Sequence, residues 1–94
     1  MTNLKTRKPL DWVTASNHAL LKGGACKCCP DHADILLRVD DELALRWAYG
    51  TATNMLKRGE VRSGPRKEFM GCVRDTHASL DETCYICEAA NQEK

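Results

Sequence analysis

The sequence predicts a mainly α-helical fold, a small three-helix domain with a long central helix, stapled by one or two Cys/His zinc sites. Three observations support this prediction. The chain has 94 residues, the size of one domain, and its 43% apolar and 29% charged residues are typical of a globular protein. Apolar residues recur every three or four positions in several stretches. Six cysteines and two of the three histidines fall in two clusters.

The N-terminal part of the chain holds a short basic segment followed by the first helix. We expect residues 1–8 to be a disordered basic N-terminus and residues 9–94 to form a single zinc-stapled helical domain. The first helix should run from about Leu10 to Lys22, because Asp11 is a suitable N-terminal cap. Residues 23–24 are both glycine, which is the usual way for a helix to end.

The longest helix is expected next. Pro30 stands where a helix can begin, and an apolar stripe with a spacing of three to four residues extends from Leu36 to Met55. We therefore predict one helix that reaches about Arg58. The two aromatic residues of this stripe, Trp47 and Tyr49, are expected to pack in the core rather than to stack on bases.

The C-terminal third is predicted to contain a loop and the last helix. Residues 59–71 combine glycine, proline and basic side chains, which favours a basic loop, with a short hairpin at residues 69–74 as an alternative. The last helix should begin near Ser79, because Ser79 and Glu82 have the spacing of a capping box. It would carry the last two cysteines on one face, since residues three apart on a helix are neighbours.

The two cysteine clusters have the composition and spacing of zinc ligands. Zinc binds four thiolate or imidazole groups, and pairs of ligands two to four residues apart on a tight turn are typical. Eight such residues would suit two ions. Two local sites or interleaved sites with a pair from each cluster would both use the full set, and the spacing alone does not choose between them. The candidate metal ligands are Cys26, Cys28, Cys29, His32, Cys72, His77, Cys84 and Cys87.

Other uses of the cysteines are less favoured. Three disulfides would need an oxidising compartment, and the first residues include no apolar stretch that resembles a signal sequence. An iron–sulfur cluster usually needs four thiolates together, whereas here the cysteines come as three and three. His18 has no cysteine near it in sequence and is expected to be an ordinary histidine. If zinc holds the fold, chelation should unfold or badly loosen the domain.

Charge is distributed in blocks although the net charge is only +1. Residues 1–30 carry a net +4, residues 31–56 a net −3, residues 57–74 a net +4 and residues 75–94 a net −4. The two basic blocks could meet and form a surface for phosphates. Alternatively, each basic block pairs with an acidic one and the surface is simply mixed.

The function that these features favour is a small, non-catalytic, regulatory zinc module that binds nucleic acid through the basic loop. Phosphate neutralisation would supply the affinity. The residues expected to contact nucleic acid are Arg58, Arg62, Arg66, Lys67 and Arg74, with help from Lys5, Arg7 and Lys8.

Two other functions remain open. The acidic blocks could bind a larger partner, which would make the protein a regulator or inhibitor of a nucleic-acid-handling enzyme. A metal-dependent nuclease is less favoured, because thiolate-rich zinc sites are usually structural. The chain contains no apolar run of eighteen residues, so we expect no membrane span and a cytoplasmic location. Nothing in the sequence indicates a small-molecule substrate.

Overall fold

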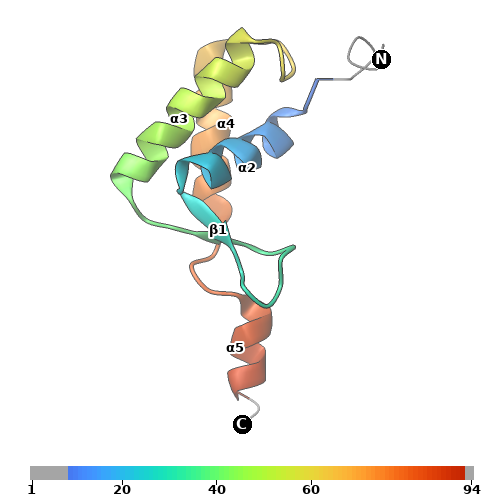
Figure 1. The fold of residues 1–94 in the computed structure, drawn as a ribbon, viewed down its shortest axis with the longest axis vertical. Coiled ribbons are helices and arrows are strands. Elements are labelled where there is room, and N and C mark those ends of the chain that lie inside the picture. The colour runs from blue at the N-terminus through green and yellow to red at the C-terminus, as the bar shows by residue number, and fades with distance from the viewer. Residues whose placement is uncertain (1–8, 93–94) are drawn as a thin grey trace.

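A computed structural model describes residues 9–92 of the chain (Figure 1). The prediction of a mainly α-helical protein is confirmed, but these residues form four helices rather than three, together with a short two-stranded hairpin. Residues 1–8, which were predicted to be disordered, lie outside the described residues. In chain order the elements are α2 (Trp12–Gly23), β1 (Cys26–Cys28), β2 (Leu36–Arg38), α3 (Glu42–Lys57), α4 (Arg66–Ser79) and α5 (Tyr85–Gln92).

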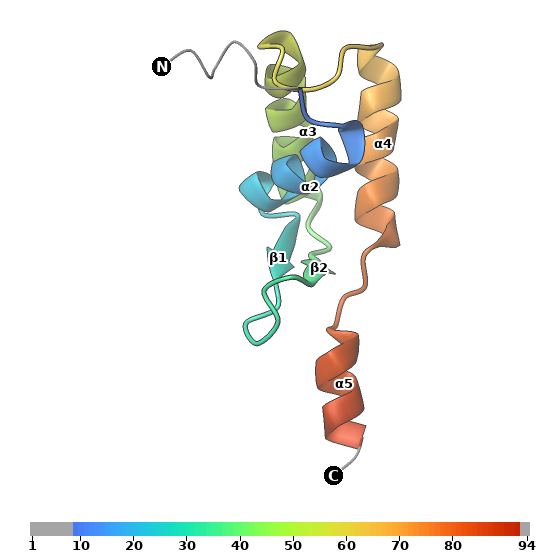
Figure 2. The same ribbon diagram turned by 90° about the vertical axis from the view of Figure 1, so that its right-hand side faces the viewer.

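The molecule has two tiers. In the upper tier α3 and α4 lie side by side and α2 crosses both of them (Figures 1 and 2). Their shared core includes Leu20, Phe69 and Val73, which are fully buried. In the lower tier the start of α5 lies beside the hairpin, and α5 extends away from it (Figure 2). Residues of the hairpin and of the start of α5 form a separate, smaller buried cluster. No helix among residues 9–92 is long and apolar enough to cross a bilayer.

The first helix begins and ends at the residues that the sequence indicated. The backbone N–H of Thr14 donates to Oδ2 of Asp11 over 3.2 Å, so Asp11 is the N-terminal cap of α2. Hydrogen bonds from the side chain and then from the backbone N–H of Thr14 hold the pKa of the Asp11 carboxyl below its usual value. Gly24 ends the helix in the left-handed region, with a φ of 85°, where a side chain would be strained.

The prediction of one long helix from Pro30 to Arg58 was wrong. Residues 36–38 form β2, which pairs antiparallel with β1 and buries Leu37 between two half-buried neighbours. This alternation has the period of a strand rather than of a helix. The helix α3 starts only at Glu42, because Oδ1 of Asp41 accepts the backbone N–H groups of Leu43 (3.0 Å) and Ala44 (3.3 Å) and so caps it.

The predicted basic loop over residues 59–71 is a loop only as far as Pro65, and residues 66–71 are helical. The helix α4 begins at Arg66, directly after Pro65, and no hairpin forms at residues 69–74. Phe69, Val73 and His77 are buried at a spacing of four residues, which is the period of a helix face. This helical spacing was not recognised in the sequence, because the segment is rich in charged residues and has a glycine at position 71.

The predicted capping box was also wrong. Ser79 is the last residue of α4, and its hydroxyl donates to the carbonyl of Thr76 over 2.7 Å instead of capping a following helix. The chain then extends through residues 80–84, and α5 starts at Tyr85. The serine therefore has a local hydrogen-bond partner within its own helix, which competes with the capping role.

Candidate metal centre

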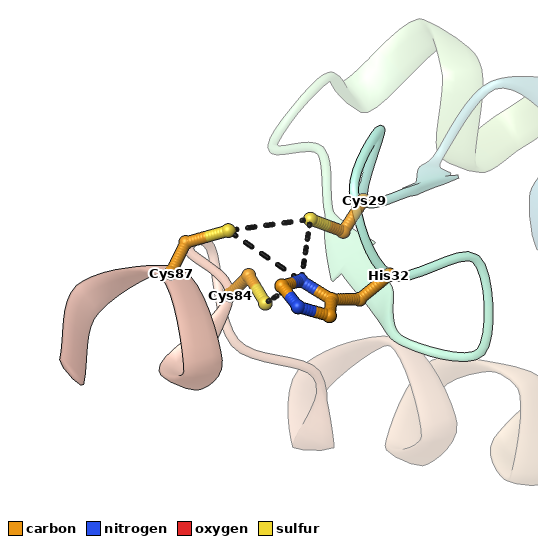
Figure 3. Close-up of side chains that lie close together, drawn as sticks. All are labelled: Cys29, His32, Cys84 and Cys87. Carbon is orange, nitrogen blue, oxygen red and sulfur yellow. Dashed lines mark hydrogen bonds between the residues drawn. The ribbon is translucent and has the colours of Figure 1, made fainter. Parts of the chain in front are cut away.

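Four of the predicted ligands converge between the hairpin and α5 (Figure 3). They are Cys29 and His32 from the hairpin loop, and Cys84 and Cys87 from the start of α5, and their ligand atoms all lie within 4.8 Å of one another. The Sγ atoms of Cys29 and Cys87 are 3.7 Å apart. Nδ1 of His32 lies 3.7, 3.5 and 3.6 Å from the Sγ atoms of Cys29, Cys84 and Cys87, respectively. The four residues are thus positioned to bind a metal ion.

These separations match those of a tetrahedral site. With a metal–sulfur distance of about 2.3 Å and a metal–nitrogen distance of about 2.05 Å, tetrahedral geometry puts two thiolates about 3.8 Å apart and a thiolate and an imidazole nitrogen about 3.6 Å apart. The measured Cys29–Cys87 and His32–Cys84 separations agree with both values to within about 0.1 Å. A disulfide would need sulfur atoms about 2.0 Å apart, and all six cysteines are free.

The hairpin positions its two ligands with a tight turn. The backbone N–H of His32 donates to the carbonyl of Cys29 over 3.2 Å, which folds the C-x2-H segment back on itself. Two further backbone bonds involving Ile35 close the loop, one from Cys29 N–H to the Ile35 carbonyl and one from Ile35 N–H to the His32 carbonyl, each 2.9 Å long. Both ligand side chains are therefore held on the side of the loop that faces α5.

The other two ligands come from the first turn of α5. Cys84 directly precedes this helix, and its carbonyl accepts the backbone N–H of Glu88 over 3.0 Å. Cys87 is three residues further along and so lies on the same face. Cys84 is buried and Cys87 partly buried, whereas the side chains between them are exposed.

Arg38 of β2 holds the segment that leads into α5. Its backbone N–H donates to the carbonyl of Asp81 over 2.7 Å, and its guanidinium donates to the carbonyl of Leu80 over 2.9 Å. The same guanidinium forms ion pairs with Asp40 at 2.9 Å and with Glu82 at 3.0 Å. The strand that follows the first pair of ligands thus fixes the approach of the second pair.

The protonation of the cluster shows the effect of bringing three thiols together. The imidazole of His32 lowers the pKa of the Cys29 thiol to about 6, which favours its thiolate form. The hydrogen bond that the Cys87 thiol shares with the Cys29 sulfur keeps Cys87 protonated and raises its pKa to about 12. A divalent cation would favour the thiolate form of Cys87 as well, because its charge stabilises every thiolate that coordinates it.

The other four predicted ligands lie elsewhere. Cys26 is buried beside α2, where burial raises the pKa of its thiol to about 11, and Cys28 is exposed. Cys72 accepts a hydrogen bond from the buried hydroxyl of Ser16 over 3.5 Å. His77 is buried and donates from Nε2 to the carbonyl of Val39 over 3.1 Å. Within the described part of the chain, only one group of three or more possible ligands is assembled.

The predicted basic contact residues are divided between different surfaces. Arg66, Lys67 and Arg74 line one groove between α3 and α4. Arg58 lies in a different groove, formed by α2 and α3, where it pairs with Glu60 at 3.1 Å. Arg62 is exposed, and its backbone carbonyl accepts the indole N–H of Trp12 over 2.8 Å.

Sequence reasoning missed two residues on α3. Trp47 was expected to pack in the core, but 65% of it is exposed, so that prediction was wrong, whereas Tyr49 does pack against the core. Arg46, which precedes Trp47, was not predicted to have a function and is also exposed. The signal was the small-residue stripe that includes Ala44, Ala48 and other buried residues of α3, because it places position 47 on the outer face.

No family model, curated protein or solved structure matches this chain. Its function is therefore inferred from the geometry and chemistry of its own residues.

Proposed function

We propose that the protein is a small, non-catalytic zinc-binding module that binds nucleic acid through the face formed by α3 and α4. The observation that carries this proposal is the segregation of charge across α4, where the basic side chains border α3 and the acidic ones lie on the other flank. The zinc ion would staple the hairpin to α5 and take no part in chemistry.

The donor set supports zinc in a structural role. Three thiolates and one imidazole fill all four positions of a tetrahedral zinc ion, so no position would be left for a reactive water. An iron–sulfur cluster usually has four cysteine ligands, and this site has three. The filled coordination sphere weighs against the nuclease alternative, and the missing fourth cysteine weighs against an iron–sulfur cluster.

The groove between α3 and α4 is basic. It is lined by Tyr49, Arg66, Lys67, Met70, Gly71 and Arg74, which include three basic residues and no carboxylate. The acidic residues of α4, Glu68 and Asp75, line the opposite flank together with Trp12 and Val13. An anionic ligand would therefore meet positive charge along one side of α4 only.

Arg66 and Lys67 lie at positions where their positive charge does not stabilise α4. Both belong to the first turn of α4, which has no side-chain cap, and positive charge at a helix N-terminus opposes the helix dipole. Residues that break such a local rule are often kept for function. Two cations at this end, where the helix dipole is also positive, would suit a phosphate.

A second groove lies further round α3 and adds one cation, Arg46. It is lined by Leu43, Arg46, Trp47, Gly50, Thr51 and Asn54, again without a carboxylate. Arg46 is within one helical turn of Tyr49, so it lies next to the first groove. Among the described residues, Arg46, Arg66 and Lys67 have no ion pair, and Arg74 contacts only the exposed Asp75 at 3.4 Å. Exposed pairs of that kind are weak and easily exchanged.

The regulator alternative has less support from the charges. Its acidic blocks would have to meet a basic partner, yet Asp40 and Glu82 are already engaged by Arg38. The carboxylates that this hypothesis needs are thus partly used to hold the fold together.

Salt-dependent binding tests the proposed function. We expect the purified zinc protein to bind a fluorescently labelled oligonucleotide at low salt, with an affinity that falls steeply as salt rises. Changing Arg66, Lys67 and Arg74 together to Ala should lower the slope of log affinity against log salt by about 2 to 3, because each phosphate that is no longer neutralised reduces it by roughly 1. Fluorescence anisotropy at several salt concentrations measures this slope.

Arg58→Ala is the matched control, because Arg58 is equally cationic but lies outside both grooves of this face and is paired with Glu60. It should leave the salt slope unchanged. If the zinc protein binds neither single-stranded nor duplex oligonucleotides at low salt, the proposed function is wrong.

A further inference from the structure

We propose that the nucleic acid bound by this face is single-stranded, and that a base stacks on the indole of Trp47. This inference rests on the proposed function and adds the class of nucleic acid and the side chain that reads it. Single-strand binding surfaces combine a positively charged groove with aromatic side chains on which bases stack. The face formed by α3 and α4 has a basic groove and an exposed tryptophan.

The two tryptophans of the chain have different environments. The indole of Trp12 is partly buried, its N–H donates to the carbonyl of Arg62, and its ring lies 5.5 Å from that of Phe69. Trp12 therefore has a structural role. Trp47 is 65% exposed, and no hydrogen bond or ring contact involves its indole among the described residues. One of the two largest side chains in the protein is thus presented to solvent.

The surroundings of Trp47 fit a nucleotide better than an apolar partner. Arg46 and Asn54 share its groove, so a phosphate and a polar base edge would both find donors beside the ring. The other large apolar side chain there is Leu43, which is 62% exposed. Arg46 also borders the other groove, which is lined by Arg66, Lys67 and Arg74, because it is one helical turn from Tyr49. A polyanion with flat apolar rings complements this mixture of cations and an exposed indole.

Two glycines keep the surface open beside these side chains. Gly50 and Gly71 lie within helices, and a Cβ added to either would have no heavy atom within 4 Å. Packing therefore does not require glycine at either position, and glycine weakens a helix relative to alanine. Each lies in one of the two basic grooves. Glycine is suited to places where a ligand approaches the backbone closely.

The exposed ring favours a single strand over a duplex. In a duplex the faces of the bases are stacked on one another, so an aromatic side chain has no free base face to contact. A single strand offers unstacked bases together with a phosphate backbone that the flanking cations can follow. Duplex binding would use the cations alone and leave Trp47 without a role.

The test compares oligonucleotides of equal length on the intact zinc protein. The probes are a labelled 15-mer of deoxythymidine, the corresponding 15-mer of uridine and a 15-base-pair duplex. We expect both single strands to bind more tightly than the duplex. Trp47→Ala should weaken single-strand binding roughly fivefold to 150-fold, the range for loss of one stacked base, and should leave duplex binding unchanged. A preference between the two single strands would identify DNA or RNA as the ligand.

Tyr85→Ala is the matched control, because Tyr85 is 64% exposed but belongs to α5, away from both grooves. It should not change the affinity, and zinc content should confirm that the site is intact. Intrinsic fluorescence gives a second measurement. Binding of an unlabelled single strand should quench the emission of the native protein, and most of this quenching should be lost in Trp47→Phe, which retains only Trp12.

The outcomes separate the two proposals. Equal binding of single strands and duplex, or unchanged single-strand affinity in Trp47→Ala, would overturn the inference while the proposed function stands. If no oligonucleotide binds at low salt, both proposals fail, and the face of Trp47 is better assigned to a protein partner.

Discussion

Removal of the metal is expected to release α5 and the hairpin loop while the body formed by α2, α3 and α4 stays folded. The reason is that the buried residues form two separate clusters. The main core lies among the three large helices, whereas the second cluster contains only Cys29, Leu37 and Cys84, with Ile35 and Cys87 packed against it. Three of these five residues are themselves ligands, so little apolar surface remains to hold the cluster without a metal.

The lower tier has no other strong source of stability. An isolated helix shorter than about 12 residues is marginal in water, and α5 has 8. The ion pairs of Arg38 with Asp40 and Glu82 are partly exposed and therefore weak. Structural zinc sites in zinc-finger peptides contribute about 10–16 kcal/mol of apparent binding energy. The metal should accordingly be the dominant contribution to the stability of this tier. The expectation that chelation unfolds or badly loosens the domain is therefore narrowed to the hairpin loop and α5.

Hydrogen exchange measured with and without a chelator tests this expectation. Amide protection should be lost over residues 84–92 and in the hairpin loop and be retained in α2, α3 and α4. Cys84→Ser should reproduce the pattern, and elemental analysis should find about one zinc per chain in the native protein. Cys28→Ser is the matched control, because Cys28 adjoins a ligand but is exposed and outside the cluster. Unchanged protection over residues 84–92 after exhaustive chelation would show that no metal holds α5 in place.

The sequence predicted the type of site but not its membership. The C-x2-H pair at Cys29 and His32 and the C-x2-C pair at Cys84 and Cys87 are local patterns, so they could be read directly. The choice among eight ligands depends on distant packing. His77, for example, is turned toward the carbonyl of Val39, a contact 38 residues away along the chain. Spacing carries no information about such a partner.

The errors in the fold have a related cause. In the sequence, the apolar residues at positions 36–37 continue the spacing of the α3 stripe. In the structure, Asp41 caps α3 and residues 36–37 belong to strand β2. Because the start of α3 was placed too early, the phase of its buried face was not fixed and Trp47 was assigned to the core. The alanines at positions 44, 48 and 52 define the true face, since small residues allow α2 to approach closely. The close approach of α2 to α3 also determines the expected effect of a substitution at Gly23.

Gly23→Ala is expected to be strongly destabilising, although alanine is the better helix former. Gly23 is the last residue of α2 and lies against the backbone of α3. A Cβ at this position would be 2.6 Å from the amide nitrogen of Ala48 and 2.9 Å from the carbonyl oxygen of Ala44. Backbone atoms within a helix cannot move aside as the end of a side chain can, so α2 must shift away from α3.

The size of the effect follows from this shift. Overpacking a core costs about 1–3 kcal/mol and occasionally more, and a contact with helix backbone should place this variant at or above the top of that range. The gain from helix propensity is only about 1 kcal/mol. Since a domain is stable by about 5–15 kcal/mol in total, the loss should lower the urea midpoint markedly. Circular dichroism during urea unfolding, with zinc present, measures it.

Gly50→Ala is the matched control, because the same substitution is made in a neighbouring helix where nothing lies within 4 Å of the new methyl group. It should stabilise the protein by about 0.5–1 kcal/mol, which is the ordinary benefit of alanine over glycine in a helix. Equal stabilisation by both substitutions would show that α2 and α3 are not in close contact. If Gly23→Ala lowers the free energy of unfolding and Gly50→Ala raises it, the small residues of α2 and α3 determine how the two helices pack. That packing in turn determines which side chains α3 presents beside α4.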